Sequence, residues 1–183
     1  MKGRLWLRLC RCVVFMFIMF FMVEAFGAAQ KETIDGIRNF TRVDDAVGCA
    51  GATEPRALAD VAKRGYKSVL NLREATEPGA AIEASRAAAE SAGLTFIHLP
   101  FNSSKPDMTV ADAFIKIVTD AANQPVFIHC ASANRVAALW MAKRMLVDKW
   151  PEEKALEEAK AIGLSSDTLR QFALDYVKAR RMP

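Results

Sequence analysis

The sequence predicts an α/β domain with a central, mostly parallel sheet of four to five strands flanked by helices. Three observations predict this class. Short runs of strand length alternate along the chain with segments of helix length. The runs are apolar at most positions, which is typical of strands buried on both faces. Glycines end two of the helix-length segments, as expected at helix C-termini.

The first 29 residues predict a secretory signal peptide that precedes the domain. Basic residues come first, an uncharged apolar run extends from Cys12 to Val23, and small residues then suit cleavage after Gly27 or Ala29. The run has about 12 residues, fewer than the roughly 20 that span a bilayer. A retained membrane anchor is the alternative. We expect an exported, periplasmic protein with one domain over residues 30–183 and no membrane attachment after cleavage.

Charge and cysteine content exclude several function classes. The leader holds four of the 25 basic residues and one of the 21 acidic residues, so the remaining chain is nearly neutral. A nearly neutral domain gives no reason to expect a nucleic-acid partner. Cys49 and Cys130 remain after cleavage, which is too few for a disulfide scaffold. Neither has metal-ligand spacing, so no metal or cofactor is expected.

The elements of the first half follow in order. A polar lead-in precedes a short strand near residues 37–40 and a helix that Thr53 can cap and Gly65 can end. Residues 66–72 combine β-branched and aromatic side chains, as a buried strand does. An alanine-rich helix follows and ends at Gly93.

The second half continues the alternation. Residues 94–101 form the next expected strand, and Thr109 can cap a helix after a polar loop. The run "PVFIH" predicts another strand, ending at His129, and a largely apolar helix follows after a short turn. Two amphipathic helices are expected to start near Pro151 and Asp167.

The turn after "PVFIH" carries the candidate chemistry. Its cysteine lies at the carboxyl end of the most apolar strand, the edge where parallel sheets bind ligands. A loop of this length can direct successive N–H groups into one concavity above a helix N-terminus, which binds an anion and lowers the pKa of a central thiol. Arg135 can hold two oxygens of a tetrahedral oxyanion. The pattern predicts a Cys130 thiolate aimed at a phosphoester or a persulfide donor.

The segment "VFIHCASANR", with "VLNLRE" and "FIHLPF" before it, resembles the bacterial branch of the dual-specificity and tyrosine-phosphatase-like proteins, which includes beta-lactamase-hydrolase-like members. The resemblance spans roughly residues 38–145 and implies the cysteine-phosphatase fold. It implies that Cys130 attacks phosphorus and forms a phosphocysteine, which water hydrolyses without a metal. The phosphoryl oxygens would be held by Arg135 and by the amides of Ala131, Ser132, Ala133 and Asn134. His129 would help to set the thiolate. The implied partner is a phosphorylated substrate, with phosphotyrosine as the default.

The loop departs from the usual family pattern at several positions. Four residues separate Cys130 from Arg135 instead of five, although the bacterial branch shares this shorter loop. Ala133 replaces a common glycine, so a positive φ there would be strained. Val136 replaces the hydroxyl residue that commonly follows the arginine.

The usual catalytic aspartate is also absent. Asn102 and Ser103 occupy its place and cannot protonate a leaving oxygen. Asp107 is the only carboxylate nearby on the same loop and is therefore the candidate general acid. Its alternative role is that of a solvated residue at a turn or helix start.

Two other function classes fit the same residues. A rhodanese-type sulfurtransferase would form a persulfide on Cys130, although the preceding His129 favours the phosphatase. A catalytically weak domain that binds an anion or a partner would keep the fold with the altered loop. Cys49 is expected in a loop near the rim of the site, either as a small half-buried residue or as the partner of Cys130 in a reversible disulfide.

Overall fold

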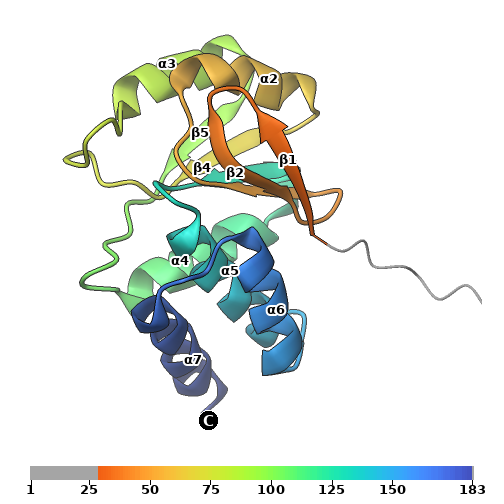
Figure 1. The fold of residues 1–183 in the computed structure, drawn as a ribbon, viewed down its shortest axis with the longest axis vertical. Helices are drawn as coiled ribbons and strands as arrows, with labels where there is room; N and C mark the ends of the chain where they lie inside the picture. The colour runs from red at the N-terminus through yellow and green to blue at the C-terminus, as the bar shows by residue number, and fades with distance from the viewer. Residues whose placement is uncertain (1–28, 183) are drawn as a thin grey trace, which may run out of the picture.

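The central feature of the structure is a six-stranded sheet with the order β1-β2-β3-β6-β4-β5 (Figure 1). The computed structural model describes residues 29–182. The strands are β1 (Gln30–Ile34), β2 (Ile37–Arg42), β3 (Val47–Ala50), β4 (Ser68–Asn71), β5 (Thr95–His98) and β6 (Val126–His129). The predicted leader, apart from Ala29, lies outside the described residues. No helix of the described part has both the length and the apolar character needed to cross a membrane.

The predicted α/β class is confirmed, with more strands than the sequence predicted. Strands β3, β6, β4 and β5 are parallel, whereas β1 and β2 form an antiparallel hairpin attached to β3. The loop expected around Cys49 is instead the strand β3, although its glycine and alanine residues are poor strand formers. All four of its residues pair with β6 and are buried, so tertiary pairing outweighs local propensity here.

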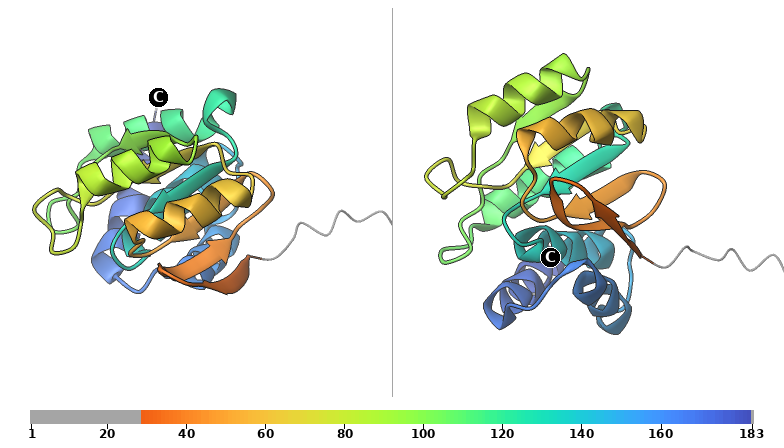
Figure 2. Two further views of the ribbon diagram at one scale, coloured as in Figure 1. Left: turned by 90° about the horizontal axis from the view of Figure 1, so that it is seen from above. Right: turned by 45° about the horizontal axis from the view of Figure 1, so that its top comes forward.

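Helices cover both faces of the sheet (Figure 1, Figure 2). One layer contains the 3-10 turn η2 (Pro55–Ala57), α2 (Leu58–Lys63) and α3 (Ile82–Ser91). The other contains α4 (Met108–Thr119), the 3-10 turn η3 (Ala121–Asn123), α5 (Asn134–Leu146), α6 (Glu152–Ile162) and α7 (Asp167–Arg181). Strand side chains alternate between these layers, with Val69 and Phe127 in one core and Leu70 and Ile128 in the other.

Helix α5 anchors the candidate site because it is buried along most of its length. Residues 135–142 are all buried, and they pack against the sheet and helices α6 and α7. Strand β6 is also fully buried. The loop between β6 and α5 therefore starts and ends on closely packed elements, which fixes its position.

Arg144 joins α5 to α6 and to the loop between β2 and β3. Its guanidinium donates to Glu158 at 2.7 and 3.0 Å, to Asp148 at 2.9 Å and to Asp44 at 3.3 Å. It also lies over the ring of Trp140, at 4.8 Å from the centroid, and over that of Trp150, at 4.4 Å. The side chain is 5% exposed, so these ion pairs are little screened by solvent.

Replacement of Arg144 by methionine is expected to lower the free energy of unfolding by about 3 kcal/mol, because it removes one partner of a buried ion-pair network and two cation–π contacts. Urea unfolding at neutral pH measures this loss. Arg56→Met is the matched control, since the Arg56 ion pairs with Asp35 and Glu54 are exposed. Equal losses in the two variants would contradict a stabilising role for the Arg144 network.

Candidate active site

The loop between β6 and α5 lies at the carboxyl edge of the parallel strands, where the sequence placed the site. Cys130 follows β6 directly, and its N–H donates to the carbonyl oxygen of Ala50 at 3.3 Å, which extends the pairing of β6 with β3. The Cys130 side chain has no exposed surface. The sulfur therefore lies at the base of the loop.

The carbonyl groups of the loop point outward, away from its concave side. The Ala131 oxygen accepts from the Ala52 N–H at 2.9 Å, and the Ser132 oxygen accepts from the Asn39 side chain at 3.3 Å. In a planar trans peptide the next N–H points opposite to the carbonyl. The N–H groups of Ser132 and Ala133 therefore point away from the Ala52 N–H and the Asn39 side chain, respectively. Within residues 29–182, no protein acceptor binds the N–H groups of residues 131–134.

Ala133 has the left-handed backbone conformation that the sequence analysis identified as a source of strain. Its φ is 76° and its ψ is −9°, and it precedes the first residue of α5. An L-residue in this region costs roughly 1–2 kcal/mol. Gly163 packs against this residue, and a Cβ added to Gly163 would lie 3.1 Å from the Ala133 Cβ. The strained turn is therefore held by a close contact from the end of α6.

Arg135 extends from the first turn of α5, and both terminal nitrogens of its guanidinium, Nη1 and Nη2, are hydrogen-bonded. Nη1 donates to the carbonyl oxygens of Leu72 at 3.2 Å and Phe101 at 3.0 Å, and to Glu77 Oε1 at 2.5 Å. Nη2 donates to Glu77 Oε2 at 2.8 Å. A guanidinium has five N–H donors. The edge formed by Nε and the second N–H of Nη2 is taken by none of these acceptors, so it can hold two phosphoryl oxygens.

The Arg135 guanidinium also interacts with the Cys130 sulfur. Burial lowers the pKa of Arg135, but the hydrogen bond to Glu77 and the nearby sulfur more than offset burial and raise that pKa above its usual value. The predicted pair of Cys130 and Arg135 is thus brought together. The positively charged guanidinium therefore lies beside the sulfur of the candidate nucleophile.

Glu77 is a site residue that the sequence analysis missed. It lies in the loop between β4 and α3 and binds both Arg135 and the Arg73 Nε, which is 3.2 Å from Oε2. Burial alone would raise the pKa of Glu77, but hydrogen bonds from Arg135 and the Glu74 N–H lower it to about 2. The sequence did contain a clue to Glu77. The loop after β4 that carries it lies at the same edge of the sheet as the Cys130 loop, so its carboxylate could be expected near the site.

A cleft of about 420 Å³ opens above the loop. Its lining comes from the loops after β4, β5 and β6 and from the start of α7: Glu74, Glu77, Asn102, Ser103, Ser104, Ala131, Ser132, Asn134, Arg135, Ser166 and Leu169. Polar groups dominate this lining, as expected for an anionic substrate. Four of the five predicted phosphate-binding residues, Ala131, Ser132, Asn134 and Arg135, line the cleft. The fifth, Ala133, is fully buried and is not part of the lining.

The Asn134 side chain fixes the end of the Cys130 loop to the turn before α7. Its Oδ1 accepts from the N–H groups of Ser165 at 2.7 Å and Ser166 at 3.0 Å, and its Nδ2 donates to the Ser165 hydroxyl at 3.0 Å. The side chain is therefore occupied in tying α5 to the turn before α7. The backbone N–H of Asn134 stays available to an anion.

His129, which the resemblance implied would help to set the thiolate, is a buried residue directly before Cys130. The ring is 1% exposed, it stacks on Phe127, and neither ring nitrogen has a hydrogen-bond partner within the described chain. Burial, followed by the positive charge of Arg73, lowers the pKa of His129 to about 3. The imidazole is neutral at physiological pH and cannot stabilise the thiolate as a cation.

His129 is expected to make the fold acid-sensitive. Its pKa is lower in the folded chain than the ordinary 6.5, so only the unfolded chain takes up the proton as the pH falls below 6.5. The contribution of His129 to the free energy of unfolding is therefore fully present above pH 6.5. It is lost progressively as the pH falls toward 3, and the loss is about 2–3 kcal/mol at pH 4.5. Urea unfolding of the wild type and of His129→Gln, each at pH 6.5 and at pH 4.5, measures this contribution. Between these pH values the variant should lose about 2–3 kcal/mol less unfolding free energy than the wild type. An identical acid loss in both proteins would contradict the assignment.

The structure places Asp107 outside the cleft lining, as the N-cap of α4. Its carboxylate accepts from the Thr109 N–H at 2.7 Å and from the Thr109 hydroxyl at 2.8 Å. These hydrogen bonds lower the pKa of Asp107, which is opposite to what a general acid requires. The capping role predicted for Thr109 thus belongs to Asp107. Asp112, further along α4, binds Tyr176 and Arg180 of α7 instead.

Cys49 lies in strand β3 and not in a loop at the rim. It has no exposed surface, and both cysteines of the described residues are free thiols. Burial, together with the negative charges of Glu158 and Asp44, raises the pKa of Cys49 well above its usual value. A thiol in this state is a poor nucleophile, which argues against the alternative of a reversible disulfide with Cys130.

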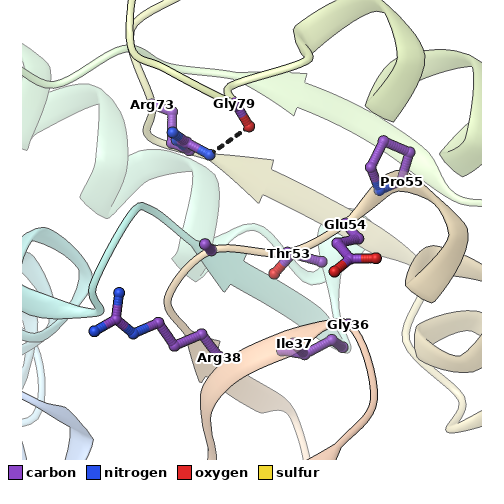
Figure 3. Close-up of a pocket in the computed structure, with 9 residues that line it drawn as sticks. Gly36, Ile37, Arg38, Thr53, Glu54, Pro55, Arg73 and Gly79 are labelled. Carbon is purple, nitrogen blue, oxygen red and sulfur yellow. Dashed lines mark hydrogen bonds between the residues drawn. The ribbon is translucent and has the colours of Figure 1, made fainter.

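A second cavity, of about 370 Å³, lies beside β2 and the segment after β3 (Figure 3). Arg73 contributes to its wall and donates to the Gly79 carbonyl oxygen at 2.7 Å. The exposed Arg38 side chain extends from β2 toward the loop that follows β6 (Figure 3). Arg38 lines this second cavity, and its neighbour Asn39 donates to the Ser132 carbonyl oxygen of that loop at 3.3 Å.

The structure is similar to solved phosphatase structures. TpbA of P. aeruginosa has a TM-score of 0.64 at 20% identity, over 83% of this chain and 90% of TpbA. The core catalytic domain of the PP-IP phosphatase SIW14 of S. cerevisiae has a TM-score of 0.66 at 18% identity, over 79% of this chain and 88% of that domain. Tk-PTP has a TM-score of 0.65 at 19% identity, over 81% of this chain and 99% of Tk-PTP. These likenesses confirm the cysteine-phosphatase fold.

A family match is more specific than these structural likenesses. A search of curated protein sequences gave no match. The family described as "Beta-lactamase hydrolase-like protein, phosphatase-like domain" matches residues 39–147, more than half of the chain. The match includes the strand β6, the Cys130 loop, Arg135 and the carboxylate of Glu77. The chain therefore belongs to the beta-lactamase hydrolase-like, phosphatase-like family, as its loop and its sheet indicated.

Proposed function

We propose that this protein is an exported cysteine-dependent phosphatase that hydrolyses a phosphoester through a phosphocysteine intermediate. One observation carries the proposal: the Arg135 guanidinium interacts with the Cys130 sulfur, and within residues 29–182 the N–H groups of the loop after this sulfur have no protein acceptor. Together they form a site for a tetrahedral oxyanion with a nucleophile at its base.

The proposed reaction has two steps. The Cys130 thiolate attacks phosphorus, an S–P bond forms, and the P–O bond to the leaving group breaks. The electron pair departs with the leaving oxygen, which takes up a proton. Water then attacks phosphorus, the S–P bond breaks, and inorganic phosphate and the thiolate are released. Arg135 and the loop amides stabilise the charge on the phosphoryl oxygens in both steps.

An aryl phosphate such as phosphotyrosine is the proposed substrate class. A variant of TpbA has been crystallised in complex with pTyr. The cleft of about 420 Å³ has room for an aromatic ring beside its polar walls.

The purified protein, offered an aryl phosphate in one reaction and thiosulfate with cyanide in another, tests this function. We expect release of inorganic phosphate and no thiocyanate. Thiocyanate without phosphate would indicate a sulfurtransferase, and binding of vanadate without any turnover would indicate an anion-binding domain.

Export is part of the same proposal and rests on the N-terminal sequence pattern. The mature chain would begin after Gly27 or Ala29. The intact mass of the protein recovered from the periplasmic fraction tests cleavage directly. A full-length mass in the membrane fraction would show a retained anchor instead.

A further inference from the structure

The resemblance places the usual catalytic aspartate where this chain has Asn102 and Ser103, and the nearest candidate, Asp107, caps a helix. An aryl ester with a basic leaving oxygen still needs a proton as the P–O bond breaks. If the chain acts as proposed above, some other group at the mouth of the cleft has to supply this proton.

Among the described residues that line the cleft, Glu74 and Glu77 are the carboxyl groups. Glu77 is unsuited to act as an acid, because Arg135 and Arg73 both bind it and its pKa is about 2. At neutral pH it remains an ionised counter-charge for the two arginines. This leaves Glu74.

Glu74 is held in the cleft wall by contacts on both its backbone and its side chain. Its N–H donates to Glu77 Oε1 at 2.8 Å, and its carbonyl oxygen accepts from the Glu77 N–H at 3.1 Å. The Asn102 Nδ2 lies 3.0 Å from Glu74 Oε1 and 3.1 Å from Oε2. The carboxyl group is partly exposed, so a substrate can reach it.

The amide of Asn102 is itself fixed in orientation. Its Oδ1 accepts from the N–H groups of Ser104 at 2.8 Å and Lys105 at 2.9 Å, so its NH₂ must face Glu74. Asn102 thus positions a carboxyl group that comes from the neighbouring loop. Asn102, at the place where the resemblance implies an acid, and the Glu74 carboxyl group are therefore direct neighbours in space.

We propose that Glu74 is the general acid of this enzyme, with Asn102 as its positioning residue. The leaving oxygen lies opposite the Cys130 sulfur during in-line attack and so points toward the mouth of the cleft, where Glu74 and Asn102 form the wall. Glu74 gives its proton to this oxygen as the P–O bond breaks. In the second step the Glu74 carboxylate takes a proton from the attacking water, which restores the acid.

The test compares two esters that differ in their need for a proton. Phenyl phosphate releases a phenol about as basic as tyrosine, whereas 2,4-dinitrophenyl phosphate releases a far weaker base. For Glu74→Gln, kcat/KM on phenyl phosphate should fall by about 100-fold or more, with little change on the dinitrophenyl ester. The double variant Glu74→Gln, Asn102→Asp should regain activity on phenyl phosphate, because it returns a carboxyl group to the adjoining position.

Two further variants separate the proposed acid role of Glu74 from a general effect of replacing a glutamate. Glu90→Gln, in an exposed glutamate of α3 away from the cleft, should change neither rate. Glu77→Gln should lower both rates alike, because Arg135 binds the phosphoryl group of either ester. Equal effects of Glu74→Gln on the two esters, or no effect on phenyl phosphate, would overturn the role of Glu74 while leaving the phosphatase intact. If the wild type released no dinitrophenolate, the proposed phosphatase function and this role would both be overturned.

Discussion

Replacement of Cys130 by serine is expected to lower the release of phosphate from an aryl phosphate by at least about 1,000-fold. A serine hydroxyl at the same place is almost fully protonated at neutral pH and is a far weaker nucleophile than a thiolate. The loop amides and Arg135 remain in the variant, so it should still bind a phosphoryl group. Initial rates on an aryl phosphate at neutral pH measure the loss.

Cys49→Ser is the matched control for this experiment. Cys49 lies in β3, is fully buried and is absent from the cleft lining, so its replacement should leave turnover nearly unchanged in folded protein. Thermal unfolding of both variants separates loss of chemistry from loss of fold. Substantial turnover by Cys130→Ser would remove this sulfur from the mechanism.

Replacement of Glu77 by alanine is expected to lower kcat/KM by roughly 100-fold, because Arg135 then loses the partner that fixes its orientation. The side chains of Arg135 and Arg73 are each 7% exposed, so the change also leaves two buried cations without their shared carboxylate. Loss of one partner of a buried ion pair costs about 3 kcal/mol. We therefore expect a lower melting temperature together with the lower activity.

Asp107→Asn provides a direct contrast to Glu77→Ala. Asparagine is also a good N-cap, so the helix should keep most of its stability, and turnover should be unaffected because Asp107 is outside the cleft lining. Steady-state kinetics and thermal unfolding of both variants complete the comparison. If Asp107→Asn lost activity and Glu77→Ala did not, the assignment of these two carboxylates would be wrong.

Local patterns were sufficient to predict the central strands and the Cys130 loop. The apolar run before His129 could only be a buried strand, and the small-residue turn after it had to precede the apolar helix. The resemblance marked Ala133 as a replaced glycine, at which a positive φ would be strained, and its φ is 76°. These predictions succeeded because each depends on residues that are close together in the chain.

The features that sequence reasoning missed depend on distant partners. Glu77 is 58 residues from Arg135, and nothing local to either residue indicates their ion pair. Strand β3 forms because β6 lies beside it, against the weak strand propensity of Gly48 and Ala50. Asp107 is the exception, because the Thr109 N–H that binds its carboxylate is only two residues away, and this helix-start role was the stated alternative.

Trapping of the covalent intermediate on Cys130 tests the central mechanistic step most directly. The wild-type protein is mixed with a ³²P-labelled aryl phosphate, quenched in acid within the first turnover and digested to peptides. We predict that the label is recovered on the peptide containing Cys130 through an acid-stable S–P bond, and that Cys130→Ser carries none. Multiple turnovers by the wild type without any label on Cys130 would contradict the account.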